Sequence, residues 1–218
     1  MVSACAVAVC KPLRRSALDV CIALALLPAL SGLAGAQPAA GTASWSVAAG
    51  DVRVRCRMTV GGSFDAVTSD VSGTLRAAAP DTGSYRGELR VGLATVDTGI
   101  ELRNEHLRNG YLELDRGPEF RHAVLSGIAL DEPPPDRPGR HETRFSGTLT
   151  LHGVRRVVEG EAELRSRNGR LQVEAAFSLS LDEFDIPPPR YLGIGVRDTI
   201  EVTVRLEAAR DETSSDGR

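Results

Sequence analysis

The sequence predicts an all-β domain of antiparallel strands, for three reasons. Apolar residues alternate with polar ones over most of the chain after residue 44. Alternation means that one strand face is buried and one is wet, which is typical of antiparallel sheets. Turn signals separate about eight such segments, and this spacing favours a barrel or a sandwich. With 218 residues, 42% hydrophobic and 25% charged, the chain has the size and composition of one globular domain.

The first 36 residues have the pattern of an export signal. They contain basic residues, an apolar run and small residues at the end: Lys11, Arg14, Arg15, Val20–Leu30 and Ala34–Gly35–Ala36. This order predicts a cleaved signal peptide over residues 1–36, with a linker over 37–44. The alternative is a membrane anchor, but the run is too short for a span and Pro28 interrupts it. We therefore expect no integral membrane segment after cleavage. The expected location is the periplasm, or else the extracellular space.

Cysteine usage and charge exclude several functions. Cys56 is the only cysteine after residue 36, so an internal disulfide is not expected in the exported chain. The net charge of −3 lacks the excess of positive charge that is typical of proteins that bind nucleic acid. The four histidines lack metal-ligand spacing, and no nucleophile or phosphate-loop motif is present. We therefore expect no metal site, no cofactor and no catalytic residues.

Turn and loop residues separate the predicted strands. The alternating segments are 52–60, 85–93, 145–151, 158–164, 171–181 and 200–208. Asn168–Gly169 predicts a two-residue hairpin, Pro80–Gly83 a turn, and the proline-rich segment Asp131–Gly139 a loop that cannot pair in a sheet. Strand-interior glycines, such as Gly160, indicate the bends that a closed sheet needs. The polar tail over 210–218 is expected to be disordered.

One segment, Asp97–Gly110, departs from the alternation. Ile100, Leu102 and Leu107 are spaced for a short helix, which Gly99 precedes and Gly110 ends. A single helix inserted in an all-β chain is suited to be the lid or plug of a barrel.

Two groups of residues are candidates for a binding site. Arg103, Asn104 and His106 either form a polar mouth that holds a head group or tie the helix to the rim by hydrogen bonds. The aromatic residues either line a tunnel or fill a core, because alternation looks the same in both cases. The members of this aromatic group are Phe64, Phe120, Phe145, Phe177, Phe184 and Tyr191.

Three stretches, in order, resemble the YceI-like family. Val96–Arg108 is similar to its "TG…RDxHL" run. Phe145–Val158 resembles its "G.LTi.GVtkpV" strand pair. Phe177–Ile186, followed by Val196–Ile200, is similar to its closing segment. The resemblance covers Trp45 to Ala208, and we place the domain at 45–209.

The resemblance implies a lipocalin-like, eight-stranded antiparallel barrel with a short inserted helix, located in the bacterial periplasm. It implies an apolar tunnel for a polyisoprenoid or quinone-like lipid, no catalysis and, in many cases, a homodimer. Our candidate ligand-binding residues are Arg103, Asn104, His106, Leu107, Phe120, Phe145, Phe177, Leu179, Phe184 and Tyr191. The alternatives are a filled barrel that serves as an interaction protein and, third, an enzyme acting on a lipid.

Overall fold

The computed structural model describes residues 44–79, 82–133, 138–191 and 194–211, without the side chain of Tyr191. The predicted signal peptide lies outside the described residues, as do most of the linker and residues 212–218 of the tail. The described residues form these strands: β1 (Ser44–Arg57), β2 (Ser63–Thr68), β3 (Val71–Ala77), β4 (Tyr85–Gly92), β5 (His122–Leu130), β6 (Gly139–Leu151), β7 (Val154–Arg167), β8 (Arg170–Ser180), β9 (Arg190–Tyr191), β10 (Ile194–Gly195) and β11 (Thr199–Arg210). The helical segments are α1 (Glu101–His106), a π turn η1 (Leu107–Tyr111) and two 3-10 turns, η2 (Pro118–Phe120) and η3 (Asp182–Phe184).

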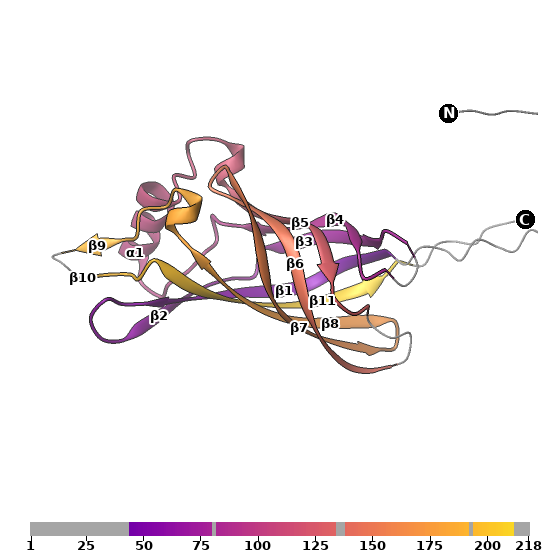
Figure 1. Cartoon of the computed structure of the whole chain (residues 1–218). Coiled ribbons are helices and arrows are strands. Elements are labelled where there is room, and N and C mark those ends of the chain that lie inside the picture. The colour runs from indigo at the N-terminus through magenta and orange to yellow at the C-terminus, as the bar shows by residue number, and fades with distance from the viewer. Residues whose placement is uncertain (1–43, 80–81, 134–137, 192–193, 212–218) are drawn as a thin grey trace, which may run out of the picture. The chain divides into compact units, whose positions relative to one another are not determined.

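The strands close into a barrel, as Figure 1 shows. They pair in the order β11-β8-β7-β6-β5-β4-β3-β1-β2, and an additional pairing between β1 and β11 closes the sheet. All pairings are antiparallel. The beginning of β1 pairs with β3, whereas its second half pairs with β2. β2 and β3 pair with different halves of the same edge of β1, so together they occupy one position around the barrel. The barrel therefore has eight strands, which confirms the predicted fold class.

The residues that alternate in the sequence point alternately to the inside and to the outside of the barrel. On β8 and β11, Phe177 is paired with Val202 and Leu179 with Ile200, and these side chains point inward. The outer face of the same strand pair carries an ion pair between Arg205 and Glu174, at 3.2 Å. The sheet thus separates an apolar interior from a charged exterior.

The predicted hairpin is present, whereas residues 80–81 of the predicted turn and residues 134–137 of the proline-rich loop lie outside the described residues. Asn168 and Gly169 both have positive φ, 50° and 71°, and they join β7 to β8 in the expected hairpin. Val60 was expected to share the buried face of the first strand, but it is 66% exposed. The reason is that β1 ends at Arg57 and the chain turns before β2, so the alternation stops short of Val60.

The predicted helix is present between β4 and β5. α1 continues directly into η1, and both lie at the same end of the barrel as β2, β9 and β10 (Figure 1). Ile100 and Leu102 are 50% and 62% exposed, whereas Leu107 packs against the main apolar cluster. One apolar residue of the three therefore attaches this segment to the interior.

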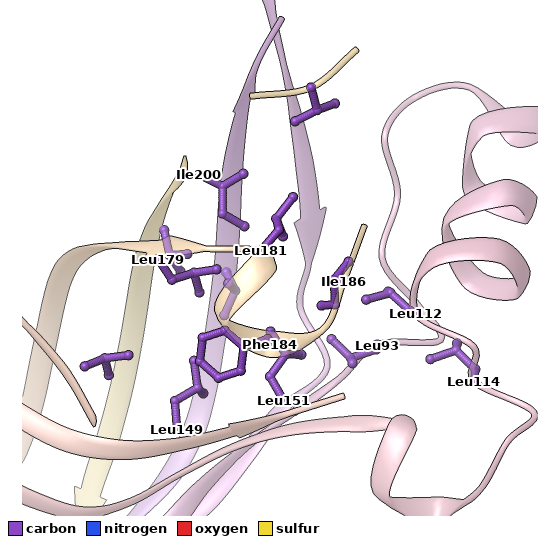
Figure 2. Close-up of a cluster of buried hydrophobic side chains, with 14 residues drawn as sticks. Leu93, Leu112, Leu114, Leu149, Leu151, Leu179, Leu181, Phe184, Ile186 and Ile200 are labelled. Atoms are coloured by element: carbon purple, nitrogen blue, oxygen red, sulfur yellow. The ribbon is translucent and has the colours of Figure 1, made fainter. Parts of the chain in front are cut away.

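Two apolar clusters occupy the interior. The larger one includes Phe184, which is only 1% exposed, and extends to the α1 end (Figure 2). The smaller one is built on Phe145, Ala162 and Leu164. Among the described residues, no helix has the length and apolar character needed to cross a bilayer.

The ordered chain extends into the predicted tail. Arg210 is the last residue of β11, and the Asp211 carboxylate accepts hydrogen bonds from the hydroxyls of Ser44 and Ser46 at 2.8 and 2.7 Å. These bonds fasten the end of the last strand to the start of the first.

Candidate functional site

A cavity of about 390 Å³ lies inside the barrel. This volume is within the range of roughly 300–1,000 Å³ that is usual for small-molecule sites. Apolar side chains of β1, β11 and the strands beside them form most of its wall. The wall residues of the first and last strands are Val52, Val54, Cys56, Ile200, Val202, Val204 and Leu206.

The cavity reaches the surface at the α1 end. Arg103 and His106 of α1 border it, together with Arg190 of β9 and Ile194 of β10. His106 and Arg190 are exposed, and Ile194 is 45% exposed. Because exposed residues of α1 and the β9–β10 hairpin line the same cavity, we call this end the mouth.

Arg103 is held in place at the mouth. Its guanidinium lies over the ring of Phe64, 4.2 Å from the ring centroid, in the geometry of a cation–π contact. Phe64 belongs to β2 and also lines the cavity. The contact therefore connects the inserted helix to the wall and keeps a positive charge at the opening.

Cys56 lies in the same wall, paired with Phe64 across β1 and β2. Burial raises the pKa of its thiol to about 11, the Asp65 carboxylate acts in the same direction, and the charge of Arg103 acts against them. At neutral pH the side chain is a neutral thiol, which is a small apolar wall residue and a poor nucleophile.

Asn104 does not border the cavity but braces the helix behind it. The residue is 4% exposed. Its Oδ1 accepts hydrogen bonds from the backbone N–H and the hydroxyl of Thr98, at 2.8 and 2.7 Å, and its Nδ2 donates to Asp97 Oδ1 at 2.8 Å. These bonds fix α1 to the loop before it. For Asn104 the geometry therefore matches the alternative in which hydrogen bonds tie the helix to the rim.

Two aromatic rings connect the cavity wall to the smaller apolar cluster. Phe145 and Phe177 form an edge-to-face pair with centroids 5.9 Å apart. Both are paired in register with Gly160 on the strand between them. A Cβ on Gly160 would lie 2.3 Å from the carbonyl oxygen of Ala176 and 2.8 Å from Cε1 of Phe145 and from Cβ of Phe177. The missing side chain of Gly160 therefore allows the close approach of the neighbouring backbone and of both phenylalanines.

A second, polar pocket lies outside the cavity, around His152. This residue is 7% exposed, and its Nδ1 lies 3.2 Å from the carbonyl oxygen of Phe184. Its Nε2 lies 3.1 Å from Glu113 Oε2. The ring of Phe120 packs edge-on against the imidazole, with centroids 4.9 Å apart. The arrangement joins η3 and the segment after η1 to the turn between β6 and β7.

The candidate residues therefore occupy different places. Those that line the cavity are Arg103, His106, Leu107, Phe177 and Leu179. Asn104 braces the helix, Phe145 lies behind Phe177, Phe120 belongs to the polar pocket, and Phe184 is buried in the apolar cluster. Tyr191 lies in β9, and its side chain is outside the described part of the chain.

Sequence reasoning missed several wall residues. They are Cys56, Met58, Tyr111 and Arg190. Cys56 and Met58 share the inward periodicity of β1, which could have identified them. Arg190 follows three prolines in an irregular segment, where no periodicity indicates which way a side chain points.

The chemistry of the cavity suits binding. None of the described residues that line it is an aspartate or a glutamate, so a general acid–base pair of the kind that the enzyme alternative requires is not assembled there. Within the described ranges, no group of three or more His, Cys, Asp or Glu residues has the geometry of a metal site.

A closed antiparallel barrel around an apolar cavity with one open end defines the class of hollow, lipocalin-like barrels. The chain belongs to the YceI-like family, since the profile of the YceI-like domain matches residues 37–208. None of the curated proteins compared with the chain matches it.

Solved structures have the same fold. A polyisoprenoid-binding domain from Saccharophagus degradans, implicated in plant cell wall breakdown, has a TM-score of 0.60 and 16% identity, over 77% of this chain and 98% of that chain. BcnA from Burkholderia cenocepacia has a TM-score of 0.56 and 14% identity, over 73% of this chain and 96% of that one. At these identities the likeness establishes the fold.

Proposed function

We propose that this protein is an exported lipid-binding protein that holds an apolar chain of the polyisoprenoid or quinone type in its barrel, without chemical turnover. The observation that carries the proposal is the 390 Å³ apolar cavity with a mouth at the α1 end. A filled-barrel interaction protein would need no such space. The polyisoprenoid-binding domain with the same fold supports the class of ligand.

Burial of the ligand supplies the driving force. Apolar surface removed from water contributes about 25 cal/mol per Å² before the costs of binding. The wall offers aliphatic and aromatic side chains without a competing carboxylate. Carriage or storage of a lipid needs this affinity and no reaction.

The proposed location is the periplasm. The basic, apolar and small-residue pattern of residues 1–36 supports export and cleavage after Ala36. A lipid carrier in that compartment shields an apolar chain from water between membranes.

The test is native mass spectrometry of protein purified from the periplasm, followed by organic extraction of the bound material. The prediction is a lipid adduct that extracts as an isoprenoid. A bare mass that stays unchanged after incubation with quinones and polyprenyl lipids would overturn the proposal.

A matched pair of variants locates the site. Phe177→Arg places a charge in the cavity wall and is expected to abolish the adduct. Val157→Arg places the same charge on the outer face of β7, where Val157 is 69% exposed, and is expected to retain it. Circular dichroism establishes that both variants fold. Cys56→Phe, which fills the cavity with an apolar ring, is expected to displace the lipid without burying a charge.

A further inference from the structure

The charges that border the cavity all have the same sign. The chain has 29 acidic and 26 basic residues, yet the described residues that line the cavity include no carboxylate. Its charged lining residues are Arg103 and Arg190, and His106 adds a third positive charge when protonated. A neutral lipid would not need this arrangement, whereas an anionic head group is stabilised by it.

The two arginines remain available to a ligand. Within the described ranges, neither Arg103 nor Arg190 forms an ion pair with an acidic side chain. Arg108, in contrast, lies close behind α1 and is paired with Glu101 at 2.8 Å. The Phe64 ring orients the Arg103 guanidinium without consuming its hydrogen-bond donors.

The depth of the cavity limits the length of the chain that it encloses. The lining extends over six residue steps from Val52 of β1 to Met58, the residue just after β1, and over six on β11, from Ile200 to Leu206. Six steps span about 20 Å along a strand, or about 15 Å along the axis of a barrel with tilted strands. Beyond this depth, neither Gly50 of β1 nor Ala208 of β11 lines the cavity.

An extended chain advances about 1.2 Å per bond, because a fully extended peptide gains roughly 3.5 Å over three backbone bonds. A tube of about 15–20 Å therefore encloses about 12–16 bonds. A much longer chain would leave its remainder in water.

We propose that the occupant is a single-chain anionic amphiphile, with about 12–16 bonds of apolar chain inside the barrel and a carboxylate or phosphate between Arg103 and Arg190. This inference rests on the proposed function and narrows it. Two sources share the chemistry, a fatty acid and a short prenyl phosphate.

The first experiment is a chain-length series. Saturated fatty acids of about 8 to about 22 carbons are titrated against the full-length exported protein at neutral pH, below their micelle-forming concentrations. Each enclosed methylene is expected to tighten binding about fourfold, and the gain is expected to stop at about 16 carbons. Affinity that continues to rise at the same rate to the longest chain would overturn the inferred depth.

The second experiment separates head-group charge from chain burial. Each acid is compared with the alcohol of equal length, and farnesyl phosphate is compared with farnesol. The anionic member of each pair is expected to bind about tenfold more tightly, the low end for a hydrogen bond to a charged group. A stronger preference within the prenyl pair identifies the phosphate as the head group, and a stronger preference within the fatty pair identifies the carboxylate.

Variants test whether the arginines at the mouth cause the preference for an anionic head group. Arg103→Gln and Arg190→Gln are expected to reduce the preference for the anion, whereas Arg155→Gln, an equal charge change on the exposed face of β7, is expected to leave it intact. If acids and alcohols bind equally well to the unmodified protein, the anionic inference is wrong and the lipid-binding function stands. If no acid, alcohol or prenyl probe binds and the native mass also stays bare after incubation with quinones and polyprenyl lipids, the proposed function itself fails.

Discussion

At the residue scale, His152 connects three segments of the chain. Its Nδ1 lies 3.2 Å from the carbonyl oxygen of Phe184, and its Nε2 lies 3.1 Å from the carboxylate of Glu113. These contacts join η3 and the segment after η1 to the turn between β6 and β7.

Glu113 makes the stability of this connection depend on pH. The Arg116 guanidinium, which donates a hydrogen bond to Glu113, lowers the pKa of that carboxyl, and His152 acts in the same direction against the effect of burial. A carboxyl whose pKa is lowered by folding stabilises the folded state above its unfolded pKa. This contribution is lost as the pH falls through the lowered value.

The corresponding variant is Glu113→Gln. We expect it to lower the melting temperature at neutral pH and to have progressively less effect as the pH falls below about 4, where the unmodified carboxyl also becomes protonated. Thermal unfolding at several pH values measures the difference. Glu119→Gln, in the same pocket, is the control, and an equal effect of Glu113→Gln at all pH values would contradict the argument.

At the scale of elements, the glycine in the middle of β7 determines how the barrel is filled. Gly160 lies between Phe145 and Phe177 on the neighbouring strands, and these two residues and the carbonyl oxygen of Ala176 occupy the space that its side chain would need. A strand-interior glycine indicates a close approach or a bend, and the structure identifies the close approach.

Gly160→Ala is therefore expected to destabilise the barrel by about 1–3 kcal/mol, the usual cost of overpacking. Urea denaturation measures the change in the free energy of unfolding. Gly139→Ala is the control in β6, because a Cβ at Gly139 meets no atom within 4 Å. Phe145→Leu in the Gly160→Ala background removes the contact with the Phe145 ring but not the contact with the Ala176 carbonyl oxygen, and should restore part of the loss. An unchanged midpoint for Gly160→Ala would show that β7 has room for a Cβ at this position.

The elements could be predicted from the sequence more completely than the site. Strand alternation and the Asn168–Gly169 turn are local patterns, so the strands and the hairpin follow from them. The bracketing glycines located the inserted helix. Inward alternation is the same for a wall and for a filled core, so it could not separate Phe177, which lines the cavity, from Phe120 and Phe184, which do not.

At the scale of the whole molecule, the seam between β1 and β11 makes the first and the last strand of the barrel neighbours. Trp45, the only tryptophan of the chain, lies at this seam and pairs with Leu75 of β3 and Arg210 of β11. Its fluorescence therefore reports on strand pairing at the seam, whereas far-UV circular dichroism reports on all strands.

A barrel that unfolds as one unit has a single transition by both probes. We expect the urea midpoints measured by Trp45 fluorescence and by circular dichroism to coincide, because the apolar clusters share Phe177 and Leu125. A fluorescence midpoint at clearly lower urea would show that the seam opens before the rest of the barrel.

The same seam has a consequence for association with other chains. A sheet closed on itself offers no long row of unpaired backbone groups, which are the usual template for strand addition and fibril growth. In the described part of the barrel, the exposed edge is that of β2, which has six residues and is bridged at Val67 by Asp97. This topology therefore protects the barrel from aggregation through its strands.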